Sequence, residues 1–257
     1  MKSKFERINR LPPYIFSEIN GLKMKLRSEK RDIIDFGMGN PDMPTPLHIR
    51  QKLKETIDKP GVGRYSVSRG IIGLRKAQSN YYKRRFNVDL DYNKEIIVTI
   101  GSKEGLANLA QAITSRGDKI LCPDPSYPVH PYGFMIAGAK LIPLKTLFNG
   151  LFDQEKYLTK VDSYLKKNSL IKAIIVSFPS NPTAQVVGLD FYKDLVKIAK
   201  KYNIYILSDL AYSEIYFNDN PPPSILEVNG AKKVAVEFTT LSKTYAMAGW
   251  RIGFAVG

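Results

Sequence analysis

The stretch IYILSDLAY, residues 204–212, decides the fold of this 257-residue chain. Its first four residues are apolar or aromatic, with no alternation of polar and apolar positions, and the run is shorter than an ordinary helix. Such a run is typical of a strand that is buried on both faces in a parallel sheet. Ser208 and Asp209 follow directly, so the strand delivers a carboxylate to the point where it ends.

Six further runs of the same kind flank this stretch, at residues 96–99, 119–122, 140–144, 173–177, 234–238 and 252–256. Helical periodicity separates several of them, at residues 46–57, 103–115 and 190–202. In the first of these segments Ile49, Leu53 and Ile57 recur at every fourth position. The alternation predicts an α/β fold with a mainly parallel, seven-stranded sheet between helices.

In an open parallel sheet, ligands bind beyond the carboxyl ends of the strands. Polar residues follow five of the predicted strands, in the segments 101–105 (GSKEG), 123–127 (PDPSY), 178–182 (FPSNP), 209–212 (DLAY) and 239–243 (TTLSK). We therefore expect these five segments to meet at one edge of the sheet. That edge is the predicted functional site.

Gly101-Ser102-Lys103 stands between an apolar strand and an amphipathic helix, where free backbone N–H groups form an anion site. Taken singly, the pattern is more often an ordinary helix cap. Asp209 also has two interpretations, a cap or a partner for a protonated pyridine nitrogen, and Tyr212 could reach the same ring.

Lys243 lies in the segment LSKTY, eight residues before Arg251. A random Ser-Lys pair is usually a surface feature. At a sheet edge and beside Arg251, however, the ammonium form would be disfavoured, which favours imine formation and proton transfer. Arg251 offers a planar, permanently charged fork that suits a phosphate.

Composition narrows the classes of function. The formal charge of +15 permits nucleic-acid binding, but the basic residues are scattered in ones and twos, which indicates a solvated surface and no nucleic-acid partner. Cys122 is the only cysteine, and only His48 and His130 could assist it, so we expect no metal site. Apolar stretches too short to cross a bilayer and a start without an export signal favour a cytoplasmic protein without a membrane partner.

The combination of motifs resembles the fold-type I, or class I/II, pyridoxal-phosphate-dependent aminotransferases. It rests on SKTYxMxGWRxG (242–253), preceded by SNPT (180–183) and DxxY (209–212). The resemblance covers nearly the whole chain, including DFGMGNPD (35–42), RYSVSRG (64–70) and IGSKEG (100–105). Within the superfamily, the chain is most similar to bacterial alanine-synthesising glutamate–pyruvate aminotransferases, with LL-diaminopimelate aminotransferases as close relatives.

The resemblance implies a role for each matching residue. Lys243 would carry pyridoxal 5′-phosphate as a Schiff base and act as the acid-base group, while Asp209 would pair with the pyridine nitrogen. The other implied cofactor contacts are Asn181 and Tyr212 at the ring oxygen, Tyr127 on the ring face, and Ser102, Lys103, Thr240 and Arg251 at the phosphate. Thr240 stands where many relatives have serine, and either hydroxyl can donate to a phosphate.

Substrate and subunit contacts are also implied. Gly39 and Asn181 would bind the substrate, and Tyr65 would reach the phosphate in a neighbouring subunit of a homodimer. Residues 1–38 would form the N-terminal arm and part of the small domain, and residues 39–257 an incomplete cofactor-binding large domain. The resemblance places the C-terminal small domain, with the arginine that clamps the substrate carboxylate, outside this sequence.

The implied reaction is transamination between an L-amino acid and a 2-oxo acid, with glutamate as donor and pyruvate as acceptor. An LL-diaminopimelate aminotransferase or a carbon–sulfur lyase of the same fold would carry the same cofactor residues. A truncated remnant that binds the cofactor without turnover is the alternative from another class. A transcription regulator ranks last, because no DNA-binding unit precedes residues 11–14.

Overall fold

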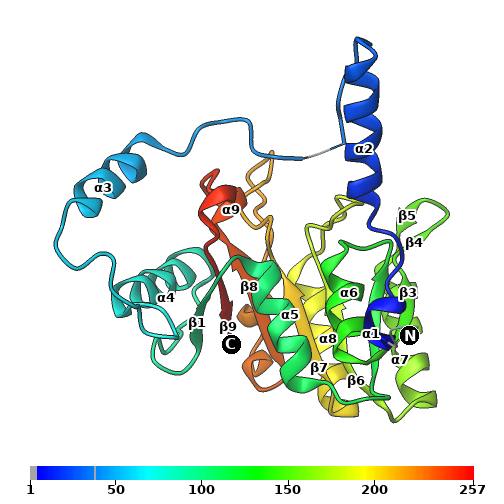
Figure 1. Cartoon of the computed structure of the whole chain (residues 1–257). Helices are drawn as coiled ribbons and strands as arrows, with labels where there is room; N and C mark the ends of the chain where they lie inside the picture. Colours follow the sequence, from blue (N-terminus) through cyan, green and yellow to red (C-terminus); the bar gives the residue numbers. More distant parts are fainter. Residues whose placement is uncertain (1–4, 38) are drawn as a thin grey trace.

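A seven-stranded sheet forms the centre of the computed structural model, which describes residues 5–37 and 39–257 (Figure 1). The strand order is β1-β9-β8-β7-β6-β2-β3. The bounds are β1 Ile96–Thr99, β2 Lys119–Asp124, β3 Lys140–Lys145, β6 Ile171–Val176, β7 Tyr205–Asp209, β8 Ala235–Thr240 and β9 Gly253–Val256. β9 pairs antiparallel with both β1 and β8, and the other four pairings of this sheet are parallel. The predicted α/β class and mainly parallel sheet are confirmed, and each of the seven predicted strands is present.

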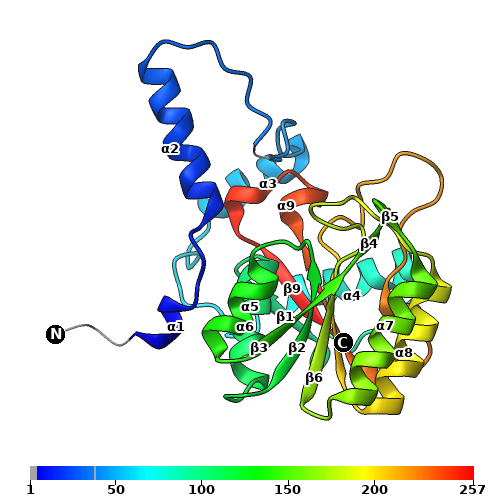
Figure 2. The ribbon, with the colours of Figure 1, turned by 90° about the vertical axis from the view of Figure 1, so that its right-hand side faces the viewer.

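Helices cover both faces of the sheet (Figure 2). On one face α5 and α6 pack together, and on the other α7 and α8 do so, with α4 beside β1. The helix bounds are α1 Glu6–Asn9, α2 Ile15–Ser28, α3 Leu47–Ile57, α4 Ile72–Phe86, α5 Ser102–Ile113, α6 Val129–Ala137, α7 Gln154–Lys167, α8 Leu189–Tyr202 and α9 Leu241–Thr244.

The central strands contribute side chains to two separate cores, because successive side chains of a strand point to opposite faces. Along β6, Ile174 and Val176 join the core under α4, α7 and α8, whereas Ala173 and Ile175 join the core under α5 and α6. All four side chains are buried. A sheet with apolar residues on both faces can exist only between two helical layers, which explains the unbroken apolar runs in the sequence.

Helix α8 illustrates how the sequence builds these layers. Its side chains Phe191, Leu195 and Val196 are buried against the sheet, at the spacing of a helical face. The helix ends at Asn203, which adopts φ 52°, a conformation that asparagine tolerates better than most residues. The predicted helix at residues 190–202 is confirmed to within one residue.

The described residues before α4 contribute little to either core. Helices α2 and α3 contain no buried side chain, and both stand away from the sheet in Figure 1. The predicted helix at residues 46–57 exists as α3, but its apolar residues Leu53 and Ile57 are exposed. Residues 1–4 and 38, the last inside the quoted 35–42 motif, lie outside the described residues.

Two smaller features complete the fold. A short hairpin of β4 (Leu147–Phe148) and β5 (Leu151–Phe152), which the strand patterns did not predict, follows β3. The 3-10 turns η1 (Ile225–Glu227), η2 (Ala231–Lys233) and η3 (Ala248–Trp250) lie in the C-terminal part of the chain.

Within residues 5–37 and 39–257, no helix has the length and apolar character needed to cross a membrane.

The two-sided burial of β6 predicts a large cost for truncating one of its side chains. We expect Ile175→Ala to lower the free energy of unfolding by about 2–5 kcal/mol, because it opens a cavity in a fully buried position. The exposed Ile97 of β1 provides the control, since Ile97→Ala should change the free energy of unfolding by less than ~0.5 kcal/mol. Urea unfolding followed by circular dichroism measures both, and equal effects would contradict the two-layer burial.

Candidate active site

A cleft of about 1470 Å³ opens at the carboxyl ends of the parallel strands, as the sequence predicts. Its walls include the strand ends, the segment 179–189 after β6 and residues 211–223 after β7. The N-terminal segment adds Tyr14, Phe16, Asn20, Phe36, Gly37, Gly39 and Asn40. The predicted site residues that line it are Gly39, Ser102, Lys103, Tyr127, Asn181, Asp209, Tyr212, Thr240, Lys243 and Arg251. Ten side chains or backbone positions that are far apart in the sequence therefore meet in one place.

Lys243 reaches into this cleft from the short helix α9, which begins directly after β8. Its Nζ donates a hydrogen bond to the carbonyl oxygen of Gly39 at 3.0 Å and lies 5.9 Å from the centre of the Tyr212 ring. Burial lowers the pKa of the Lys243 amine. The expected lowering is thus present, but its cause is burial, and the charge of Arg251 is not needed to explain it.

Asp209 is the last residue of β7, and its side chain is only 8% exposed. Its Oδ2 lies 2.8 Å from Nε2 of His130, while its Oδ1 is buried without a hydrogen-bond partner in the described part of the chain. A buried carboxylate oxygen without a donor is costly unless a ligand satisfies it. The free oxygen therefore marks a place for a protonated nitrogen.

His130 is the site residue that the sequence did not reveal. It belongs to α6, is fully buried, and its ring meets the Tyr127 ring edge-on at 5.8 Å. From the sequence, His130 is named only as a residue that could assist Cys122 in binding a metal. Since 79 residues separate it from Asp209, no local pattern could have indicated the pair. Its role here is to hold one oxygen of Asp209 and leave the other free.

Tyr212 and Asn181 approach each other from the ends of β7 and β6. The Nδ2 of Asn181 donates to the Tyr212 hydroxyl at 3.3 Å, which is a long hydrogen bond. Burial raises the pKa of Tyr212, so its phenol stays protonated and can act as a donor. Both groups thus present N–H and O–H donors to the same part of the cleft.

The opposite end of the cleft is cationic and rich in backbone donors. Helix α5 begins at Ser102, after Gly101 with φ 76°, and no side chain caps it. Arg251 extends across this helix start, and a Cβ atom at Gly101 would lie 2.2 Å from its Nη2. Glycine at position 101 therefore leaves room for the guanidinium beside the uncapped N–H groups, and it also suits the positive φ there. A phosphate group suits this combination.

Thr240 and Lys103 also line the cleft, the first with a hydrogen-bonded hydroxyl and the second with an exposed side chain. The Thr240 hydroxyl accepts a hydrogen bond from the N–H of Ser242 at 3.2 Å and so caps α9. Lys103 is exposed, and its Nζ lies 5.9 Å and 6.0 Å from the ring centres of Tyr14 and Tyr127. Tyr127 thus stands between Lys103 and the buried His130.

Tyr65 is the one predicted site residue outside the cleft. Its side chain is fully exposed, on the segment between α3 and α4. It makes no contribution to the cleft of its own chain. Its predicted contact with a neighbouring subunit stays a prediction.

A buried carboxylate, a half-buried lysine and an anion-binding helix start in one cleft define a site for an anionic cofactor with a basic ring. Residues 31–257 match the family model of aminotransferase class I and II, so the chain belongs to this family. Its members depend on pyridoxal 5′-phosphate, which is accordingly the cofactor of this chain.

Two curated relatives and a solved structure illustrate the similarity. The chain is 50% identical over 254 residues to the glutamate-pyruvate aminotransferase AlaC of Escherichia coli (strain K12), covering 99% of the chain and 61% of AlaC. It is 47% identical to the LL-diaminopimelate aminotransferase of Aquifex aeolicus (strain VF5), covering 98% and 64%. The structure of substrate-bound BacF from Bacillus subtilis superimposes with a TM-score of 0.89 at 36% identity, covering 100% and 64%. The chain thus spans about three fifths of the length of these proteins.

The cleft fits pyridoxal phosphate at both ends. The free Oδ1 of Asp209 suits a protonated pyridine nitrogen, and the helix start beside Arg251, kept open by Gly101, suits the phosphate. Lys243, Tyr212 and Asn181 lie in the same cleft.

The position of Lys243 predicts a single covalent attachment point. Wild-type chain mixed with one equivalent of pyridoxal phosphate and reduced with borohydride should carry the label at Lys243, because burial favours its neutral, nucleophilic amine. Peptide mass mapping locates the label. Lys243→Ala should lose it, whereas Lys83→Ala, which removes an exposed lysine of α4, should keep it. A label that persists at the cleft in Lys243→Ala would refute the assignment.

Proposed function

We propose that this chain forms the cofactor-binding region of a transaminase that moves an amino group between an L-amino acid and a 2-oxo acid. One observation carries the proposal. The half-buried amine of Lys243 and the free, buried Oδ1 of Asp209 lie in the same cleft, next to a cationic helix start. An acid-base group, a partner for a ring nitrogen and a phosphate site are the three requirements of pyridoxal phosphate chemistry.

Bound pyridoxal phosphate supplies a ring that withdraws electrons from the substrate α-carbon. Lys243 would attach to the cofactor at rest and, once displaced by the substrate amine, would carry a proton away from the α-carbon. Its lowered pKa favours the neutral amine that this step requires. The same Nζ donates a hydrogen bond to the carbonyl oxygen of Gly39, beside the proposed substrate position.

Asp209 would hold a proton at the ring nitrogen. His130 supports this role because it satisfies Oδ2, while Oδ1 has no hydrogen-bond partner among the described residues. Tyr212 and Asn181 would donate to the ring oxygen, and Tyr127 would cover the ring face. Ser102, Lys103, Thr240 and Arg251 would hold the phosphate. Gly39 and Asn181 would contact the substrate.

For the substrates, we infer glutamate as the amino donor and pyruvate as the acceptor, giving 2-oxoglutarate and alanine. The similarity to AlaC, named a glutamate-pyruvate aminotransferase, supports this pair. The similarity to an LL-diaminopimelate aminotransferase supports the alternative substrate. A carbon–sulfur lyase or a cofactor-binding remnant without turnover would use the same cofactor residues.

The proposal includes a cytoplasmic homodimer. Tyr65 and the apolar residues Leu53 and Ile57 of α3 are exposed and remote from both cores, as expected of a surface that meets a second subunit. We also propose residues 1–38 as an arm with part of the small domain, and residues 39–257 as the large domain. Helix α2 projects away from the central sheet, which supports that division (Figure 1).

A half-reaction tests the proposed function. The chain loaded with pyridoxal phosphate is mixed with L-glutamate, L-alanine or LL-diaminopimelate, and its visible absorption band is followed. We expect the band to bleach with glutamate and alanine, because amino transfer removes the conjugated form of the cofactor. Bleaching with LL-diaminopimelate alone would establish the alternative substrate. A stable band with every amino acid would contradict turnover.

Asp209 provides a sharper prediction about the mechanism. Asp209→Ala should still form the reducible label at Lys243, but the rate of bleaching should fall by at least ~10²-fold, because the ring nitrogen loses its charged partner. Stopped-flow absorption measures the rate. Asp89→Ala, which removes an exposed carboxylate of a surface ion pair, is the control and should bleach at the wild-type rate. Wild-type bleaching in Asp209→Ala would remove the proposed role.

A further inference from the structure

Residues 210–223 connect β7 to η1 and form one wall of the cleft. The wall includes Tyr212, Ile215, Tyr216, Phe217 and Asn218, and most of these side chains are exposed. An irregular segment of this length has no ladder of backbone hydrogen bonds to hold it. Its shape must therefore be fixed by contacts with other parts of the chain.

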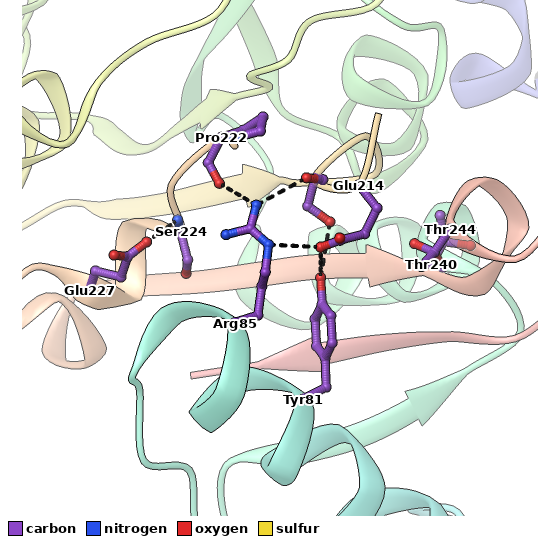
Figure 3. A network of polar contacts seen from close by, with 9 residues as sticks. Tyr81, Arg85, Glu214, Pro222, Ser224, Glu227, Thr240 and Thr244 are labelled. Carbon is purple, nitrogen blue, oxygen red and sulfur yellow. Dashed lines mark hydrogen bonds and ion pairs between the residues drawn. The ribbon is translucent and has the colours of Figure 1, made fainter. Parts of the chain in front are cut away.

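One guanidinium group holds both sides of this segment (Figure 3). Arg85, near the end of α4, donates from Nε to Oε1 of Glu214 at 3.1 Å. Its Nη2 donates to the carbonyl oxygens of Ser213 at 3.3 Å and Pro222 at 3.1 Å. Arg85 thus ties the beginning of the segment to its end, across eight intervening residues.

Tyr81, one helical turn before Arg85, completes the cluster. Its hydroxyl donates to Oε1 of Glu214 at 2.5 Å and lies 3.2 Å from Oγ of Ser213. The side chains of Arg85 and Glu214 are only 18% and 23% exposed, so this ion pair is better shielded than the Lys83–Asp89 pair, which also involves α4 and is 51% and 81% exposed. A shielded, hydrogen-bonded pair loses more when one partner is removed than an exposed pair does.

The far end of the segment is anchored separately. Ser224 caps η1, and its N–H donates to Oε1 of Glu227 at 2.7 Å in a reciprocal capping box (Figure 3). The Ser224 hydroxyl donates to the buried carboxyl of Glu237 on β8. With β7 at one end and this cap at the other, the contacts of α4 decide the position of the part between.

Tyr212 lies two residues before Glu214, and within residues 5–37 and 39–257 its hydroxyl has a single hydrogen bond, the 3.3 Å contact with Asn181. We propose that Arg85, Tyr81 and Glu214 form a clamp that positions Tyr212 and the cleft wall 213–222 for the reaction. The three residues touch neither Lys243 nor Asp209, so they act through the segment. This inference rests on the proposed function and assigns to α4 a part in the site.

Hydrogen exchange in the cofactor-free chain tests the clamp without any reaction. In Arg85→Ala, we expect the backbone N–H groups within residues 211–222, where Pro221 and Pro222 have none, to exchange about 10- to 100-fold faster, because three hydrogen bonds of one guanidinium are lost. Exchange in β6 and β8 should stay at the wild-type rate. Lys83→Ala, which breaks an exposed ion pair on the same helix, is the matched control. Unchanged exchange at 211–222 would overturn the clamp.

Milder variants guard against a general loss of structure. Glu214→Gln keeps the shape of the side chain but removes its charge, and Tyr81→Phe removes only one hydroxyl. Both should quicken exchange at 211–222 less than Arg85→Ala does, in the same residues. Faster exchange throughout the sheet in all three variants would show a purely structural role and would contradict the proposal.

A spectroscopic readout tests the link to Tyr212. When pyridoxal phosphate is bound, a Tyr212 hydroxyl that donates to the ring oxygen favours the deprotonated form of that oxygen. Loosening Tyr212 in Glu214→Gln should therefore raise the pH midpoint of the visible band by about one unit, with Lys83→Ala unchanged. Faster exchange with an unmoved midpoint would overturn the positioning role. If the chain takes up no pyridoxal phosphate, the proposed function fails, and the exchange experiment alone decides for or against the clamp.

Discussion

The parallel pairing of β6, β7 and β8, buried on both faces, is the constraint on which the rest of this structure depends. Parallel strands end at the same edge, so whatever residue follows each strand is brought to a common place. Here those residues include Asn181, Asp209 and Lys243. Burial between two helical layers keeps the strands in register, and the register sets the spacing of the three chemical groups.

Two carboxyl groups on neighbouring strands show how burial can serve two purposes. Glu237 of β8 accepts hydrogen bonds from Tyr82, Ser208, Ser224 and the N–H of Ile225, so both of its oxygens are satisfied. Burial nonetheless raises the pKa of Glu237. The Asp209 carboxyl faces the other side of the sheet, toward α6, with one oxygen on His130 and the other free. The first group joins α4, β7, β8 and η1, whereas the second is available to a ligand.

The two groups also connect the site to the scaffold. Ser208 and Asp209 are consecutive, and β7 directs the first to Glu237 and the second to the cleft. Beyond Asp209 the chain leaves the sheet, forms the cleft wall and returns through Ser224 to Glu237. The two ends of the wall are therefore fixed on adjacent strands, at Asp209 of β7 and through Ser224 at Glu237 of β8. The middle of the wall is positioned by its contacts with Arg85 and Tyr81 of α4.

The sequence by itself determined the α/β class and the seven main strands, and it predicted that Lys243, Asp209 and the start of α5 would line one cleft, because each of these depends on local periodicity or on a compact motif. Only the tertiary structure decided that His130 would hold Asp209, that burial would lower the pKa of Lys243, that α3 would expose its apolar residues, and that Arg85 would hold the cleft wall. These features join residues that are tens of positions apart, or depend on what covers a side chain. Local patterns carry no information about either, since folding alone brings such groups together.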